Sequence, residues 1–262
     1  MKLTLIITTY NWPESLLLVL QSVENQLVSP SQIIIADDGS TKETKKLIDN
    51  FNKNSDLNII HSWQEDIGFR AARSRNNAIL KSSGEYIVLI DGDSILHPHF
   101  IKDHITNAEP GYFIQGSRAL ISEKRTKKIL AKKIINFSFF SLGLKNRKNL
   151  IHSKLFSLIF SNKNNNLRSI KSCNMAFYRE DCININGFNN EFEGWGREDS
   201  EFIVRLINNG LKRKNVRFNI IQLHLWHNEN SRKSLKRNDV MLDEAIQNRS
   251  DWCINAICSP NG

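Results

Sequence analysis

An apolar run that ends in two carboxylates constrains this chain more than any other stretch. Residues 87–90 (Ile-Val-Leu-Ile) predict a strand buried on both faces, and Asp91-Gly92-Asp93 follows directly. In open α/β folds, ligands bind beyond the carboxyl ends of such strands. Two carboxylates this close are costly to keep ionised, so we expect a divalent metal and a phosphate ligand here. The alternative interpretation is a polar turn, because Asp-Gly is common in turns.

The sequence before this run alternates between strand and helix patterns, which is typical of a parallel sheet with right-handed crossovers. Strands are predicted at residues 3–9, 33–36 and 57–63, and helices at residues 13–27, 41–51 and 68–82. Asn11 is expected to cap the first helix, with Pro13 in its first turn. Parallel strands end at the same edge, so Thr8, Asp38 and Asp91 should meet there.

A nucleotide suits this edge, because carboxylates can accept hydrogen bonds from a base or ribose while a metal holds the phosphates. The sequence contains no Gly-x-Gly-x-x-Gly after the first strand and no Gly-x-x-x-x-Gly-Lys-Ser/Thr. It therefore supports neither a dinucleotide-binding Rossmann site nor a P-loop.

The 262 residues carry a net charge of +9, which favours an anionic partner. The excess lies between residues 117 and 172, where Glu123 is the only acidic residue among many lysines and arginines. Apolar and aromatic residues are interspersed with these cations in the segment 122–170. Three interpretations are open: an ordinary insertion with a solvated basic face, contact with an anionic membrane surface or lipid-linked acceptor, and nucleic-acid binding. No RNA- or DNA-binding module is recognisable, so we expect no nucleic acid.

The sequence also limits the compartment. No apolar run approaches the roughly 20 residues of a membrane span, and residues 1–9 lack the features of a signal peptide. The spacing of the four cysteines predicts neither a zinc site nor redox chemistry. We expect a cytoplasmic protein.

Two clusters stand out in the last third of the chain. Trp195 lies between two glycines, and such a ring can stack on a sugar, although a core tryptophan is commoner. Glu198 and Asp199 open a predicted helix, where acidic residues also favour the positive helix end. His224 and His227 lie near the end of a strand predicted at 220–227 and are candidate metal ligands, or else hydrogen-bonded core residues.

The ordered set of motifs resembles the inverting glycosyltransferases of family 2. The matching elements are Thr8-Thr9-Tyr10-Asn11, Asp37-Asp38-Gly39-Ser40, Gly68-Phe69-Arg70, Arg75-Asn76 and Asp91-Gly92-Asp93. Residues 173–227 are similar to the C-terminal region of galactosyl- and N-acetylgalactosaminyltransferases, with its Gly-Trp-Gly-x-Glu-Asp element. The resemblance implies an α/β fold of the GT-A type, with a Rossmann-like, mostly parallel central sheet flanked by helices.

The same resemblance implies a division of the chain into four parts. Residues 1–121 would form the nucleotide-sugar-binding half, and residues 122–170 a basic and aromatic insertion. Residues 171–228 would form the acceptor-binding and catalytic half, and residues 229–262 a helical tail.

On the donor side, the resemblance implies that Asp38 reads the uracil of a UDP-sugar with Thr8 beside the nucleotide. Asp91 would lie near the ribose and donor sugar, and Tyr10, Arg70 and Arg73 would complete the substrate-binding set. Asp93 and His227 would bind Mn²⁺, or Mg²⁺, with His224 as a further ligand. Imidazole and carboxylate together favour Mn²⁺, because Mg²⁺ prefers oxygen ligands and water.

On the acceptor side, the resemblance implies that Asp199 is the catalytic base, Glu198 orients the acceptor and Trp195 is its platform. A sugar hydroxyl is a poor nucleophile, so a positioned carboxylate must take its proton as attack develops. A metal would neutralise the departing diphosphate. Arg197 stands where galactosyltransferases often have glycine, so their acceptor specificity does not carry over.

The function expected from this resemblance is inverting transfer of a hexose or N-acetylhexosamine from a UDP-sugar to a glycan or glycolipid hydroxyl. The expected setting is bacterial surface polysaccharide or lipooligosaccharide synthesis, peripherally on the inner face of the cytoplasmic membrane. The alternative is a non-catalytic sugar-nucleotide or glycan-binding protein with a degenerate site. Retention of Asp93, Asp199 and His227 argues against it, because binding alone needs no base.

Overall fold

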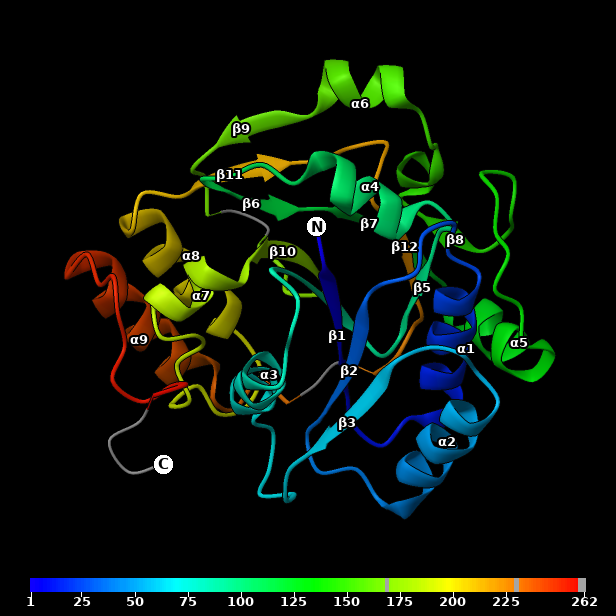
Figure 1. The fold of residues 1–262 in the computed structure, drawn as a ribbon, viewed down its shortest axis with the longest axis horizontal. Helices are drawn as coiled ribbons and strands as arrows, with labels where there is room; N and C mark the ends of the chain where they lie inside the picture. The colour runs from blue at the N-terminus through cyan, green and yellow to red at the C-terminus, as the bar shows by residue number, and fades with distance from the viewer. Residues whose placement is uncertain (168–169, 229–230, 259–262) are drawn as a thin grey trace.

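The first half of the chain alternates strands with helices, as the sequence predicts (Figure 1). The computed structural model describes residues 1–167, 170–228 and 231–258. The strands are β1 (Leu3–Thr9), β2 (Gln32–Asp37), β3 (Ile59–Trp63) and β4 (Tyr86–Asp91), and the helices between them are α1 (Pro13–Glu24), α2 (Lys42–Lys53) and α3 (Ala71–Leu80). Neighbours in the order β3-β2-β1-β4 run parallel, so their carboxyl ends lie at one edge.

Strand β1 is apolar along most of its length because helices cover both faces of the sheet. Leu5 and Ile7 pack on one face with Leu16 of α1, whereas Ile6 packs on the other face with Ala72 of α3. Successive side chains of a strand point to opposite faces, so a strand covered on both sides needs apolar residues throughout.

Beyond β4 the main sheet becomes mixed. Among the described residues it has eight strands in the order β3-β2-β1-β4-β10-β6-β11-β9. The added strands are β6 (Tyr112–Gln115), β9 (Asn162–Asn164), β10 (Asn174–Tyr178) and β11 (Lys212–Asn215). β10 runs antiparallel to β4.

A second, smaller sheet lies beside the carboxyl end of β4. Its order is β5-β12-β7-β8, formed by β5 (Ser94–Leu96), β12 (Ile221–His224), β7 (Ser117–Ile121) and β8 (Leu144–Lys145). Its central strand, β12, pairs His224 with Ser94, the residue after Asp93. This pairing brings a histidine to the acidic strand end from 130 positions along the chain.

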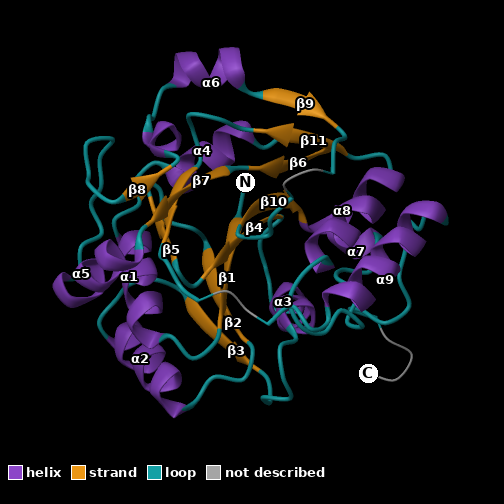
Figure 2. Ribbon diagram, turned by 180° about the vertical axis from the view of Figure 1, so that it is seen from behind, coloured by secondary structure: helices purple, strands orange, loops and turns teal. Residues whose placement is uncertain are grey.

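The remaining helices cover the sheet faces and edges. They are α4 (Phe100–Asn107), α5 (Glu123–Lys132), the 3₁₀ helix η1 (Arg147–Leu150), α6 (Lys154–Phe160), α7 (Arg179–Asn184), α8 (Glu198–Asn208) and α9 (Leu235–Gln247). Seen from behind, α3, α7, α8 and α9 gather on one side of the sheet, and α1, α2 and α5 on the other (Figure 2). Within the described ranges, no helix combines the length and apolar composition that a membrane span requires.

The basic segment is tied to both sheets. It contributes β8 to the small sheet and β9 to the edge of the main one. Ile129 of α5 packs with Leu18 and Ile95 in a third apolar cluster. By contrast, α6 stands out at the top of Figure 1 with its large apolar side chains exposed. The division of the chain at residues 121, 170 and 228 stays a prediction.

Local expectations fail at three points. Asn11 does not cap α1: its backbone has φ +46°, and its side-chain oxygen accepts a hydrogen bond from the Thr41 N–H (2.8 Å). Helix α1 ends at Glu24, so Leu27 is exposed rather than on a helical face. The strand predicted at 220–227 ends at His224, because the Trp226 N–H then turns to the Thr126 hydroxyl (2.9 Å).

Candidate active site

The carboxyl edge of the parallel strands brings together the polar residues that the sequence predicts there. Thr8 pairs in register with Asp91, and the Asp38 N–H donates to the Thr9 carbonyl (3.0 Å). The Gly92 N–H donates to the Thr8 carbonyl (2.7 Å). A Cβ on Gly92 would lie 3.0 Å from the Thr9 hydroxyl, so this turn suits glycine. Thr8, Asp38 and Asp91 therefore share one short edge.

The carboxylate of Asp38 is held in a fixed orientation, in which it can accept further hydrogen bonds. One of its oxygens accepts the Arg70 backbone N–H (2.7 Å), and the other accepts the Gln64 side-chain amide (2.6 Å). Burial raises the pKa of Asp38, and these two hydrogen bonds partly offset that rise. Its neighbour Asp37 is structural, since it pairs with His61 (2.8 Å).

Gln64 was not predicted, although the sequence holds a signal for it. It directly follows β3, and Trp63 of β3 pairs with Asp37. The first residue after a parallel strand lies at the same edge as the residues that end its neighbours. Gln64 could therefore have been placed beside Asp38.

The three other predicted substrate-binding residues differ in position. The Arg70 side chain is buried and donates to the Glu65 carbonyl. The Tyr10 hydroxyl donates to Asp66 (3.0 Å) at the exposed rim. Arg73 is exposed. Helix α3 thus directs Arg73 away from the strand ends.

The buried arginine on this helix is Arg75. Its guanidinium forms an ion pair with Glu198 of α8 (3.1 Å), and only 5% of its side chain is exposed. Burial works against its charge, yet Glu198 and Asp91 raise the pKa of Arg75 above its ordinary value. Arg75 thus connects the edge of β4 with the amino end of α8. Its sequence signal is helical spacing, because Ala72, Arg75 and Ile79 share the buried face of α3.

Asp93, His224 and His227 form a cluster able to hold a metal. The Nε2 atoms of His224 and His227 lie 3.4 and 3.3 Å from the two carboxylate oxygens of Asp93. In both histidines Nδ1 lies 2.7 Å from a main-chain carbonyl oxygen, of Leu225 and Asn228 respectively. Such a carbonyl accepts from Nδ1–H, which leaves the Nε2 lone pair toward Asp93 as in ligating histidines.

This donor set fits a first-row divalent cation. Ligands at about 2.0–2.2 Å from such an ion lie roughly 3 Å or a little more from one another, as these atoms do. Two imidazoles and a carboxylate suit Mn²⁺ or Zn²⁺ better than Ca²⁺. Burial, and then the charge of Asp93, raise the pKa of Asp91. A cation bound here would relieve that repulsion.

Asp199 and Glu198 lie in the first turn of α8, which begins at Glu198 as predicted. The Asp199 carboxylate accepts the Ser172 N–H (3.3 Å) and the Ser200 hydroxyl (3.2 Å). Burial, and then the charge of Glu198, raise the pKa of Asp199 to about 7. A carboxylate with this pKa can accept a proton at neutral pH more readily than an ordinary aspartate.

Trp195 is 40% exposed, in a loop that the C-terminal helix supports. Asn238 of α9 donates to the Gly196 carbonyl (2.8 Å), and a Cβ on Gly194 would lie 2.3 Å from the Ser234 hydroxyl. The ring is therefore held in position with one face contacted by the Arg232 guanidinium, 5.5 Å from its centroid. Residues of the predicted tail thus support the loop that carries Trp195.

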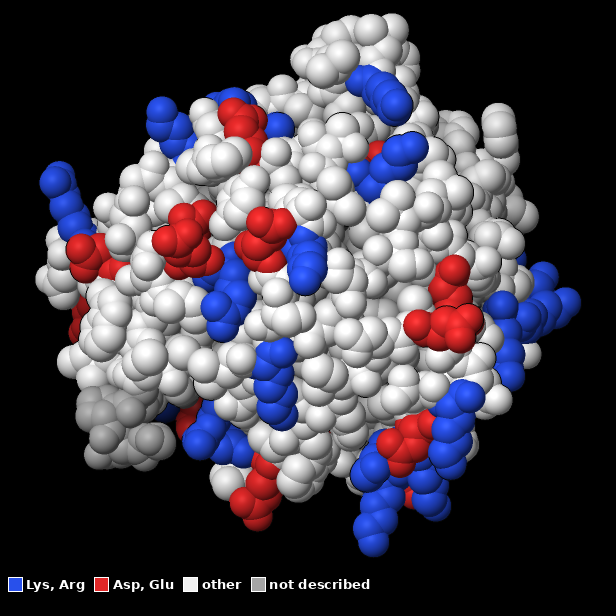
Figure 3. Space-filling model, viewed as in Figure 1, with Lys and Arg blue, Asp and Glu red and all other residues white. Residues whose placement is uncertain are grey.

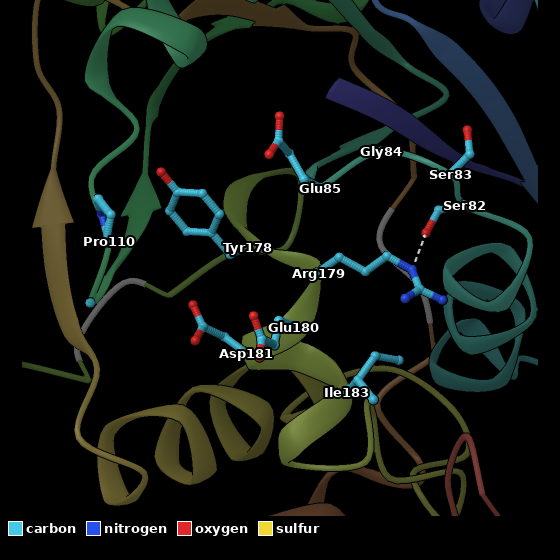
Figure 4. A pocket seen from close by; sticks show the side chains of 11 residues that line it. Ser82, Ser83, Gly84, Glu85, Pro110, Tyr178, Arg179, Glu180, Asp181 and Ile183 are labelled. Atoms are coloured by element: carbon cyan, nitrogen blue, oxygen red, sulfur yellow. Dashed lines mark hydrogen bonds between the residues drawn. The ribbon is translucent and has the colours of Figure 1, made fainter. Parts of the chain in front are cut away.

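A cavity of about 600 Å³ lies at the opposite end of β4 (Figure 4). It is lined by the turn before this strand, from Ser82 to Glu85, and by Tyr178 and Arg179 at the end of the antiparallel β10. Arg179 donates to the Ser82 hydroxyl (3.0 Å), and Tyr178 pairs in register with Tyr86. This cavity is at the amino end of β4 and shares no residue with the cluster around Asp93.

The family description "Glycosyl transferase family 2" matches residues 4–183, more than half of the chain. A second description, "N-terminal domain of galactosyltransferase", matches residues 156–227. The chain belongs to glycosyltransferase family 2. This is the family that its motifs resemble.

Three relatives are 26–28% identical to this chain over the aligned residues. Chondroitin synthase of Escherichia coli is 26% identical over 231 residues, which cover 79% of this chain and 32% of that protein. Hyaluronan synthase of Pasteurella multocida is 28% identical over 228 residues, which cover 79% of this chain and 23% of that protein. A GalNAc(5)-diNAcBac-PP-undecaprenol beta-1,3-glucosyltransferase of Campylobacter jejuni is 26% identical over 182 residues, covering 68% and 56%. The chain thus spans about a quarter to a third of the two synthases and just over half of the glucosyltransferase.

Solved structures confirm the expected GT-A fold. Staphylococcus aureus TarS, residues 1–349, in complex with UDP superposes with a TM-score of 0.64 at 15% identity, covering 95% of this chain and 66% of that one. The mannosyltransferase PcManGT of Pyrobaculum calidifontis, in complex with GDP-Man and Mn²⁺, superposes with a TM-score of 0.58 at 17% identity. This match covers 85% of this chain and 56% of that one.

Proposed function

We propose that this glycosyltransferase moves a hexose or N-acetylhexosamine from a UDP-sugar to a sugar hydroxyl, with inversion at the anomeric carbon. The observation that carries the proposal is the position of Arg75. Its ion pair with Glu198, beside Asp91, joins a nucleotide-facing strand end to the helix that bears Asp199. Donor and base can therefore act next to each other.

The donor side supports UDP in particular. Asp38, with both oxygens already oriented, is proposed to accept from the uracil N–H, and Thr8 to lie beside the nucleotide. The Thr8 hydroxyl is buried without a protein partner in the described residues, which leaves it available to a ligand. Asp91 is proposed to lie near the ribose and donor sugar. TarS has been solved with UDP and with UDP-GlcNAc, which supports the same class of donor.

Asp93, His224 and His227 are proposed to hold Mn²⁺, with Mg²⁺ as a weaker substitute. When bound, the metal would neutralise charge on the leaving diphosphate. The Mn²⁺ complex of the mannosyltransferase neighbour supports this choice of ion.

Asp199 is proposed to take the proton of the acceptor hydroxyl while Glu198, held by Arg75, orients that acceptor. Trp195 offers a partly exposed ring on which a sugar face can stack. A single displacement with one base inverts the configuration, so a UDP-α-sugar would give a β-linkage. NMR of the product decides this point, and an α-linked product would overturn the mechanism.

A lipid-linked acceptor in surface polysaccharide synthesis is the proposed setting, and it agrees with the undecaprenol acceptor in the name of the Campylobacter jejuni relative. On α6, Leu155, Leu158 and Ile159 are between 62% and 83% exposed. Figure 3 shows this protrusion as largely uncharged, with lysine and arginine side chains beneath it. An exposed apolar helix above cations suits an anionic membrane surface, which would make the enzyme peripheral on the inner face of the cytoplasmic membrane.

Flotation with anionic liposomes tests the membrane contact. Leu158→Glu should reduce the bound fraction severalfold, because it places a negative charge at the bilayer surface. Val240→Glu changes an exposed apolar residue of α9 in the same way and should bind like the wild type. Equal binding by both variants would refute a membrane contact through α6.

A panel of sugar nucleotides tests the function itself. Mn²⁺-dependent release of UDP from a UDP-hexose or UDP-N-acetylhexosamine is expected, with GDP-mannose as the control donor. Release of no nucleotide from any donor would favour the non-catalytic binding protein. Salt-sensitive DNA binding without affinity for UDP would instead favour a nucleic-acid-binding protein.

A further inference from the structure

A second cluster of histidines lies apart from Asp93. His97 and His99 follow β5, Asp103 lies in the first turn of α4, and His152 comes from the basic segment just before α6. One ligand atom from each of His99, Asp103 and His152 lies within 4.8 Å of the others. The ring centroids of His99 and His152 are 4.5 Å apart, and those of His97 and His152 are 5.0 Å apart.

The carboxylate of this cluster is fixed in position. Asp103 is 5% exposed, and one of its oxygens accepts the Ile220 N–H (3.2 Å) and lies 2.9 Å from Nε2 of His152. An ion pair between Asp103 and His152 would account for these two residues alone. It does not account for the second imidazole, His99, brought within reach of the same point.

The histidine rings of this cluster stack on one another beside Asp103. The ring centroids of His97 and His99 are 5.5 Å apart with an interplanar angle of 29°, and the neutral imidazole is the form that binds metals. His97 is not among the three grouped ligands, and its Nδ1 already accepts the His99 N–H (3.3 Å).

We propose that His99, Asp103 and His152 form a second metal site, which binds Zn²⁺. Two imidazoles and one carboxylate are a three-residue donor set that zinc accepts, with a fourth position left for water. Ca²⁺ and Mg²⁺ prefer oxygen ligands. The site contains two histidines, an aspartate and no cysteine, so it is compatible with the lack of a Cys-x-x-Cys spacing in this sequence.

The position of this site gives it a structural role. The His97 N–H donates to the Ile221 carbonyl at the start of β12, whereas His224 ends that strand, and these two strand residues are about 10 Å apart. His152 directly precedes Ser153, which caps α6 by accepting the Phe156 N–H (3.2 Å). A metal shared by α4 and His152 would fix the base of α6, which Figures 1 and 2 both show above α4.

Calorimetric titration of the metal-free full chain with zinc chloride tests the proposal. A Cys258→Ser background removes the exposed thiol as a competing ligand. The wild-type background should bind two equivalents of Zn²⁺. His99→Ala with His152→Ala should bind one, and the lost site should be at least about tenfold weaker.

The matched control is His224→Ala with His227→Ala, which removes ligands of the first cluster. This control should still bind one equivalent of Zn²⁺ at the second site and should still show a rise in Tm on adding Zn²⁺. His99→Ala with His152→Ala should lose that rise. His99→Gln alone serves if the double variant does not fold, and it should weaken the same equivalent. Unchanged zinc stoichiometry and affinity in the folded His99 variants would overturn the proposal. Because zinc binding is read without sugar transfer, failure here leaves the proposed function standing.

Discussion

The rate of sugar transfer should fall as the pH is lowered through 7, because the proposed base becomes protonated. Burial and Glu198 raise the pKa of Asp199 to about 7, so this acid holds its proton at a higher pH than an ordinary aspartate. The ionised fraction would be about nine tenths at pH 8 and about one tenth at pH 6. We therefore expect kcat to fall about tenfold between these two values.

The assay measures UDP release from the best donor of the panel at saturating donor and Mn²⁺ across this pH range. Saturating metal matters because protonation of His224 or His227 would release the ion and imitate the loss of a base. Binding of UDP in the presence of Mn²⁺, measured at each pH, is the control. It should stay constant while kcat falls.

Two substitutions test whether Asp199 causes the fall of kcat at low pH, which is the acidic limb of the pH profile. Asp199→Asn should keep UDP binding, lose at least about two orders of magnitude in kcat and show no limb. Arg75→Gln removes a cation that lowers the pKa of Asp199, so its limb should move to higher pH by about one unit. Arg73→Gln, on the exposed side of the same helix, should leave the limb in place. A limb that persists in Asp199→Asn would refute the assignment of the base.

Three further predictions concern the metal ligands and the fold. His227→Ala should raise the Mn²⁺ concentration for half-maximal activity at least about tenfold in a metal titration, and an unchanged requirement would exclude His227 as a ligand. Gly194→Ala should lower the free energy of unfolding by more than the roughly 1–2 kcal/mol of a left-handed backbone, measured in urea. Gly210→Ala, with φ +92° and open space around a Cβ, is its control, and equal losses would contradict the contact with Ser234. Arg205→Ala should lower the free energy of unfolding by about 3–5 kcal/mol, because it leaves Glu201 buried and unpaired. Lys127→Ala, in the exposed pair with Glu123, should change stability by less than about 1 kcal/mol, and a small loss at Arg205 would contradict its role in the core.

The strand ends could be predicted because their signal is local. Unbroken apolar runs such as that of β1 require cover on both faces, and alternation with helices requires parallel order, so Thr8, Asp38 and Asp91 had to converge. The position of β12 could not be predicted from local sequence. No residue pattern indicates that this strand lies between β5 and β7, yet this order brings His224 to Asp93.

Side-chain direction limited the prediction of individual site residues. The resemblance placed Arg70 and Arg73 in the substrate-binding set, whereas the helical period of α3 selects Arg75, which shares a face with Ala72 and Ile79. The support of the Trp195 loop by Asn238 and Ser234 joins two segments some forty residues apart, and no residue pattern in the tail indicates it. Such contacts depend on how α8 and α9 pack, which periodicity does not specify.

The charges around Arg75 connect metal binding to the strength of the base. Asp91, Glu198 and Asp199 all act on this one buried cation, and a single positive charge does not compensate three carboxylates. Burial raises the pKa values of Asp91 and Asp199, and neighbouring carboxylates raise them further because Arg75 only partly compensates. A divalent cation at Asp93 would add positive charge beside Asp91 and leave more of the field of Arg75 for Glu198 and Asp199.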